Sequence, residues 1–197
     1  APQRAEEMIE QLMEAMEELK ARSTVLTRGS ETVRCRVEHS EALAAVTRAA
    51  GEAWAEHAGG TSGALWGAAI CAASTSLLRT PDLSQDTVLE AVDAALLAMQ
   101  SLGKAEPGDK TMIDAFVPFA VSLRAGLADG LTLDRAWENA AAAATAAAAA
   151  TAGLRPKLGR ARPLAEKSLG HPDAGAVSLA MVVSTIGHSM MKEGTHG

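Results

Sequence analysis

The stretch TLDRAWENAAAAATAAAAATAG, residues 132–153, decides the fold class. Alanine has the highest helix propensity of all residues, Thr132 is a typical N-cap, and Gly153 is a typical helix end. We therefore expect a helix over about 133–152. The alanine run carries Glu138 and Asn139 and is too weakly apolar to span a membrane. We interpret it as a surface of small side chains that lets neighbouring helices approach closely, rather than as a binding site.

Similar helical patterns extend in both directions along the 197 residues. Apolar side chains recur at helical spacing, while glycine, proline and capping residues mark the ends of each pattern. Short connections make successive helices antiparallel. The sequence therefore predicts an all-α bundle of antiparallel amphipathic helices in a single domain, 1–197. Seven helices are expected, over about 3–22, 41–57, 61–79, 85–101, 109–129, 133–152 and 173–192, with Pro118 kinking or dividing the fifth.

Two longer segments lack a helical pattern. Residues 23–40 (STVLTRGSETVRCRVEHS) are the least helical part of the chain, and we expect a mobile loop there, with Ser40 as the N-cap of the next helix. Residues 154–172 contain three prolines and two glycines besides polar residues. A connection of that length is usually functional or disordered, so we expect an active-site loop.

Composition excludes several classes of protein. The chain has 18 Lys and Arg against 24 Asp and Glu, a net charge of −6, and no Tyr, which argues against a nucleic-acid partner. Two cysteines form neither a disulfide framework nor a metal-binding set, and the five histidines lack partners at ligand spacing. With neither a signal peptide nor a membrane span in view, we expect a cytoplasmic location and no membrane partner. Because the chain begins at Ala1, we expect it to be processed or to be the downstream part of a longer chain.

Glycines and hydroxyls gather before three alternate helices, in the segments 59–63 (GGTSG), 103–112 (GKAEPGDKTM) and 170–175 (GHPDAG). If the helices alternate in direction, these segments share one end of the bundle. Free N–H groups and the helix dipole attract anions to a helix N-terminus, and glycine lets a phosphate approach the backbone. Ordinary capping explains any one segment; the three together indicate a phosphate site. Basic residues that could neutralise phosphate are Lys104, Lys110, Arg155, Lys157, Arg160 and Arg162.

The same segments carry a family resemblance. GGTSGALWG (59–67), GKAEPGDKTMIDA (103–115) and LGRARPLAEKSLGHPDAGAVSLA (158–180) resemble motifs of the nucleotide-binding subunit or domain of dihydroxyacetone kinases, and the resemblance covers about 41–190. The GRARPL form is more similar to the ATP-dependent kinases, in which this domain is fused behind a substrate-binding domain. The resemblance implies a barrel of eight antiparallel helices that holds ATP or ADP with Mg²⁺ at one end.

The resemblance also implies roles for particular residues. It places phosphate contacts at Thr61 and Ser62 and a catalytic arginine at Arg160, while Arg162 and Pro163 stand where the family usually has Ser and Tyr. The family's GDGDHG-like aspartate motif for two magnesium ions is missing from this sequence, so no metal ligand is assigned. The helix at 3–22 would then match the family's second helix. The nucleotide-binding set that it implies is Gly60, Thr61, Ser62, Gly63, Gly103, Asp109, Thr111, Met112, Asp173, Ala174 and Gly175.

The expected function is therefore the nucleotide-binding component of a dihydroxyacetone-type kinase in glycerol metabolism. It would hold Mg-ATP or Mg-ADP for phosphoryl transfer to a short keto-sugar on a separate domain or subunit, and would be inactive alone. The alternative is a non-catalytic scaffold or regulatory binding module without metal ligands. A hollow helical barrel that carries an apolar ligand is a third reading. The sequence leaves open whether the chain forms a homodimer.

Overall fold

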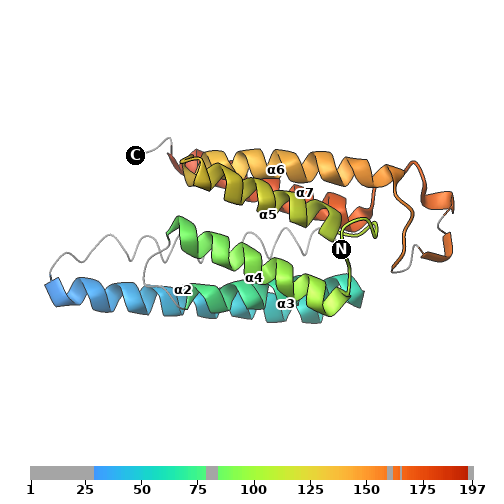
Figure 1. Ribbon diagram of the computed structural model, residues 1–197. Coiled ribbons are helices and arrows are strands. Elements are labelled where there is room, and N and C mark those ends of the chain that lie inside the picture. Colours follow the sequence, from blue (N-terminus) through green and yellow to red (C-terminus); the bar gives the residue numbers. More distant parts are fainter. Residues whose placement is uncertain (1–28, 79–83, 159–161, 165, 195–197) are drawn as a thin grey trace. The chain divides into compact units, whose positions relative to one another are not determined.

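The structure is a computed structural model that describes residues 29–78, 84–158, 162–164 and 166–194 (Figure 1). Over these residues the chain contains helices and no strand, which confirms the all-α class. Contacts within the chain group into two compact units, Ala1–Leu102 and Gly103–Gly197. A single domain, and a closed barrel of all the helices, stay predictions. The predicted helix at 3–22 lies outside the described residues.

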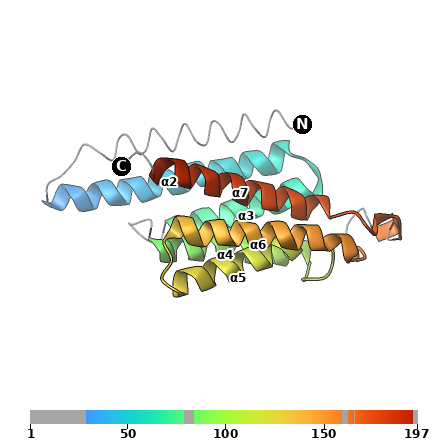
Figure 2. The same ribbon diagram turned by 90° about the horizontal axis from the view of Figure 1, so that it is seen from above.

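The first unit contains helices α2 (Gly29–His57) and α3 (Gly60–Leu77), which pack along each other, and most of α4 (Gln85–Gly103) (Figure 2). Gly51 of α2 and Gly67 of α3 face each other where the two helices cross. A Cβ atom on Gly67 would lie 2.7 Å from the Gly51 carbonyl oxygen, and one on Gly51 would lie 2.9 Å from the Gly67 carbonyl oxygen. Two backbones approach this closely only because neither residue has a side chain.

The expected loop over 23–40 is wrong from residue 29 onward, because α2 already begins at Gly29. Ser40 therefore lies inside the helix and is not an N-cap. Between residues 30 and 50 the sequence has neither Gly nor Pro, and its valines and threonines each cost a helix less than about 0.7 kcal/mol relative to alanine. Nothing in that stretch ends a helix. Residues 23–28 lie outside the described part of the chain.

The second unit is built from α5 (Ile113–Ala128), α6 (Leu133–Ala150) and α7 (Ala174–Gly194), which lie side by side (Figure 1). Alanines at four-residue spacing on α6 are buried, which confirms that the alanine run is a packing surface. The Trp137 indole nitrogen donates a hydrogen bond to the Val183 carbonyl (2.8 Å), joining α6 to α7. These alanines are Ala136, Ala140, Ala144 and Ala148, and Ala141 is buried beside them.

Several predicted boundaries shift in this unit. Helix α5 begins at Ile113 instead of residue 109, because Lys110 has a left-handed backbone (φ 61°) that a helix cannot include. Pro118 lies inside α5 without dividing it. The long loop contains two short 3₁₀ helices, η2 (Arg162–Leu164) and η3 (Glu166–Ser168), besides η1 (Thr151–Gly153) at the end of α6. Among the described helices, none combines the length and apolar character that crossing a bilayer requires.

Candidate functional site

The turn before α5 is organised by Asp114, in the first turn of that helix. Its two carboxylate oxygens accept hydrogen bonds from the backbone N–H groups of Gly108 and Thr111, the second at 2.7 Å. The Thr111 hydroxyl accepts a further bond from the Ile113 N–H (3.2 Å). The sequence analysis missed Asp114, although an acid three residues after Thr111 is a capping-box signal.

Asp109 connects this turn to the long loop. Its Oδ2 accepts a hydrogen bond from the Glu106 N–H (2.9 Å), and its Oδ1 lies 3.1 Å from the Lys157 ammonium nitrogen. The Lys157 N–H also donates to the Asp109 carbonyl (3.1 Å). The bond from Glu106 and the ammonium of Lys157 hold the pKa of Asp109 below its usual value.

Lys110 is buried at the same turn. Its ammonium group donates hydrogen bonds to the carbonyl oxygens of Leu154 (3.0 Å) and Ser168 (2.7 Å) and to the Ser168 hydroxyl (3.4 Å). An ammonium group has three N–H donors, and these contacts use all of them. Lys110 therefore has no N–H left for a direct hydrogen bond to a phosphate, and its part in neutralising one stays a prediction.

The N-terminus of α7 meets this turn. Asp173 caps the helix by accepting a hydrogen bond from the Ala176 N–H (2.8 Å), and its own N–H donates to the buried Thr151 hydroxyl (2.8 Å). Burial raises the pKa of Asp173 above its usual value, and the negative charge of Asp114 raises it further. A Cβ atom on Gly175 would lie 3.5 Å from the Cβ atom of Met112.

The cap at Asp173 leads to a prediction for the pH dependence of stability. Because its native pKa is raised, the carboxyl group stabilises the fold at acid pH, and this contribution is lost as the pH rises through the native pKa. Asp173→Asn keeps an acceptor for the Ala176 N–H without the charge. We expect the free energy of unfolding of the variant to equal that of the wild type at about pH 3 and to exceed it at about pH 7.

Urea unfolding at both pH values measures this difference. Asp173→Ala is the control, because it removes the cap itself and is expected to lose about 1 kcal/mol. A stability gap between Asp173→Asn and the wild type that does not change with pH would contradict the prediction.

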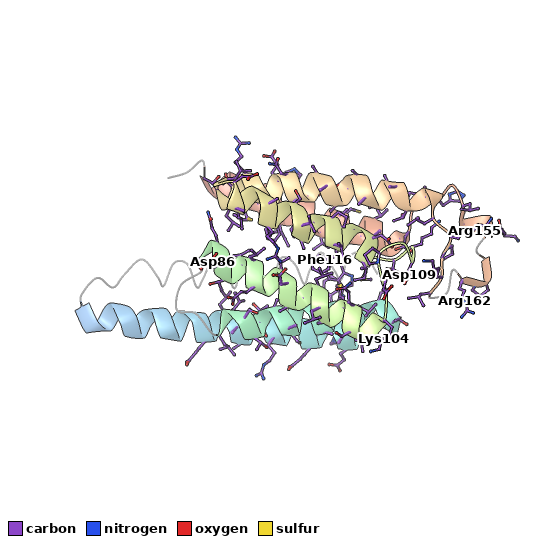
Figure 3. All side chains as sticks on the ribbon, in the orientation of Figure 1. Asp86, Lys104, Asp109, Phe116, Arg155 and Arg162 are labelled. Atoms are coloured by element: carbon purple, nitrogen blue, oxygen red, sulfur yellow. The ribbon has the colours of Figure 1, made fainter. Side chains whose placement is uncertain are left out.

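The predicted site residues of the second unit gather around one end of its three helices. Met112 contacts Gly175, and Thr111 and Ala174 are their chain neighbours. Asp109 lies on the same turn, and Figure 3 shows it before α5, with Arg155 and Arg162 on the loop beyond the end of α6. Gly103 is the last residue of α4. Arg160 lies outside the described residues.

The remaining predicted residues begin α3 in the first unit. Gly59 and Gly60 have left-handed backbones (φ 65° and 63°), and no side chain caps this helix. Thr61 and Ser62 are exposed, so their side chains and the first N–H groups of α3 are open to a ligand. Gly63 is buried, and a Cβ atom there would lie 3.2 Å from the Ala58 carbonyl carbon, so glycine lets the start of α3 pack closely against Ala58. That these residues share a site with Met112 and Gly175 stays a prediction.

The described residues do not fit a resident metal ion. No group of three or more His, Cys, Asp or Glu in the described ranges could hold one. The carboxylates of Asp109, Asp114 and Asp173 already accept backbone N–H groups, and Asp109 also pairs with Lys157.

The fold and the site define an all-α domain whose glycine-containing loops meet a helix N-terminus at one end of a three-helix group. The chain belongs to the DAK2 domain family, whose model matches residues 23–188.

Its relatives include kinases of known substrate. The chain is 45% identical over 150 residues to the L-erythrulose kinase of Pectobacterium atrosepticum, covering 76% of this chain and 25% of that protein. It is 49% identical over 141 residues to the D-erythrulose kinase of Mycolicibacterium smegmatis, covering 72% of this chain and 24% of that protein. The ADP-binding subunit DhaL of the PEP-dependent dihydroxyacetone kinase of Escherichia coli is 34% identical over 128 residues, covering 65% of this chain and 61% of DhaL. The chain thus spans about a quarter of the length of the erythrulose kinases.

Proposed function

We propose that this chain is the nucleotide-binding component of a dihydroxyacetone-type kinase that phosphorylates a short keto-sugar. The observation that carries the proposal is the contact of Gly175 with Met112, which brings the turn before α5 to the N-terminus of α7. Helix N-termini attract phosphate, and the N-terminus of α7 lies at this turn. The relatives support the proposal, because two are erythrulose kinases and a third is an ADP-binding subunit.

In this proposal the nucleotide is ATP or ADP. Thr61 and Ser62 would donate hydrogen bonds to its phosphates beside the open N–H groups of α3. Met112 and Gly175 would line the nucleotide pocket, and Arg160 would neutralise charge that develops on the transferred phosphoryl group. Mg²⁺ would accompany the nucleotide and bridge phosphate oxygens, with ligands that the described residues do not supply.

The sugar would bind to a separate domain or subunit. The erythrulose kinases are about four times as long as the matched segment, which leaves room in them for a substrate-binding part. We propose a dihydroxyacetone-binding partner of this kind, a cytoplasmic location, and no kinase activity for this chain alone. The alternative, a scaffold or regulatory module, is favoured by the lack of a metal-ligand set among the described residues.

Calorimetric titration of ADP into this chain, with and without Mg²⁺, tests the proposal. We expect Thr61→Ala with Ser62→Ala to weaken ADP binding about tenfold or more, since two hydroxyl contacts to phosphate are lost. Thr145→Ala with Thr185→Ala is the matched control, because both hydroxyls are exposed and bond only to the preceding turn of their own helix. Unchanged affinity in the first variant would remove the phosphate assignment. Absence of any ADP binding by the wild type would favour the scaffold.

A further inference from the structure

The segment 154–168 carries an unusual charge for this chain. It holds five basic residues and one acid, while the whole chain has a net charge of −6. Two of the basic side chains have acidic partners: Arg155 lies 2.9 Å from Glu166, and Lys157 lies 3.1 Å from Asp109. The basic residues are Arg155, Lys157, Arg160, Arg162 and Lys167.

One side chain holds both ends of this segment. The Lys110 ammonium nitrogen is 3.0 Å from the carbonyl oxygen of Leu154 and 2.7 Å from that of Ser168. These carbonyls begin and end the segment, so it is a loop with a closed neck, as in an Ω-loop. Lys110 is only 4% exposed, and a buried ammonium group is stable only when its donors are bonded.

The backbone conformation of Lys110 indicates that the lysine side chain is needed to hold this loop, because glycine would fit the backbone more easily. Its φ of 61° lies in the left-handed region, where glycine fits more easily than lysine. The Lys110 ammonium acts electrostatically on the carboxyl group of Asp173, which lies near it. Nearby negative charge offsets part of the cost of burying a cation.

We propose that Lys110 is a positioning residue that closes the neck of the loop between Leu154 and Ser168 and thereby holds Lys157 beside the 109–112 turn. A second anchor supports this placement, because the Lys157 N–H donates to the Asp109 carbonyl (3.1 Å). The closure of the neck is inferred only from the hydrogen bonds of Lys110 to Leu154 and Ser168 and of Lys157 to Asp109. Its consequence for a ligand rests on the proposed function, since the ligand is the nucleotide phosphate that Lys157 would meet.

Hydrogen exchange of the whole chain without nucleotide tests the closed neck. In Lys110→Met we expect amides within 154–168 to exchange about tenfold or more faster, while amides in the centres of α5 and α6 change far less. Lys104→Met is the matched control, since Lys104 also has a left-handed backbone (φ 53°) but is exposed, and it should leave the loop unchanged. Equal acceleration in all elements, or an unchanged loop, would overturn the proposal.

A second variant guards against a failure to fold. Lys110→Gln keeps an N–H₂ group, but this group ends one bond short of the lysine ammonium, is uncharged and has two donors instead of three, so it should accelerate loop exchange to an intermediate degree. Loop exchange in Lys110→Gln equal to that of the wild type would count against the closed neck.

Calorimetry with ADP tests the consequence for the ligand. We expect Lys110→Met to weaken ADP binding about tenfold and Arg135→Met to leave it unchanged, since the Arg135 side chain is exposed and pairs with Glu138 on its own helix. A loosened loop with unaltered ADP affinity would overturn the positioning role. If the wild type binds no ADP, the proposed function and the role toward phosphate fail together, and the exchange data still decide whether Lys110 closes the loop.

Discussion

Replacing Phe119 by alanine is expected to lower the free energy of unfolding of the second unit by about 3–5 kcal/mol. The Phe119 side chain is 1% exposed, and its ring meets Trp137 edge-on with the ring centroids 5.0 Å apart. It also lies 6.3 Å from the ring of Phe116, measured between centroids. The truncation removes both ring contacts and leaves a cavity between α5 and α6 that rigid neighbours cannot fill.

Urea denaturation, with hydrogen exchange to locate the effect in α5 and α6, measures this loss. Val121→Ala is the matched control, because Val121 lies on the same helix and is 62% exposed. We expect that control to change stability by less than about 0.5 kcal/mol. A loss below about 1 kcal/mol in Phe119→Ala would contradict the packing described for this unit.

Local patterns predicted the helices well where local signals determine the ends. The expected helices at 85–101 and 133–152 correspond to Gln85–Gly103 and Leu133–Ala150. Ser84 accepts a hydrogen bond from the Thr87 N–H (3.1 Å), which is the N-cap that its position before the apolar pattern predicted. Periodicity and capping act within one turn of the chain, so a sequence can reveal them.

The start of α5 could not be predicted in this way. The left-handed backbone at Lys110 is compensated by bonds to Leu154 and Ser168, which lie 44 and 58 residues further along the chain. No local pattern reports such a contact, and Lys110 therefore looked like an ordinary surface cation. The start of α2 was predicted wrongly for a local reason. The polar residues before residue 41 were interpreted as a loop, although residues 30–50 contain no helix breaker and α2 already begins at Gly29.

The candidate site was predictable in part. Alternation of short-looped antiparallel helices placed the segments before α5 and α7 at one end, and the contact between Met112 and Gly175 agrees with that placement. Asp114 escaped notice because its two bonds go backward to backbone N–H groups of a turn that was expected to be helical. The assignment of these residues to a nucleotide stays a prediction.

Replacing Gly67 by alanine is expected to lower the free energy of unfolding of the first unit by about 1–3 kcal/mol. The new methyl group would lie 2.7 Å from the Gly51 carbonyl oxygen and 3.1 Å from the Ala55 Cα atom, and both are backbone atoms that cannot rotate away. Helices α2 and α3 must therefore separate or tilt. Gly153→Ala is the matched control, since a Cβ atom there meets nothing within 4 Å, and it should leave stability nearly unchanged.

Gly67→Ala should also change the position of the N-terminus of α3. Thr61 and Ser62 lie less than two turns before Gly67 on this helix. The rings of Trp54 and Trp66 pack with their centroids 5.9 Å apart and their planes tilted by 43°. We expect Gly67→Ala to change the fluorescence of this pair and to weaken ADP binding, because a tilted α3 redirects the open N–H groups at its N-terminus. Stability, fluorescence and ADP affinity all equal to those of the Gly153→Ala control would show that α2 and α3 do not cross at these glycines.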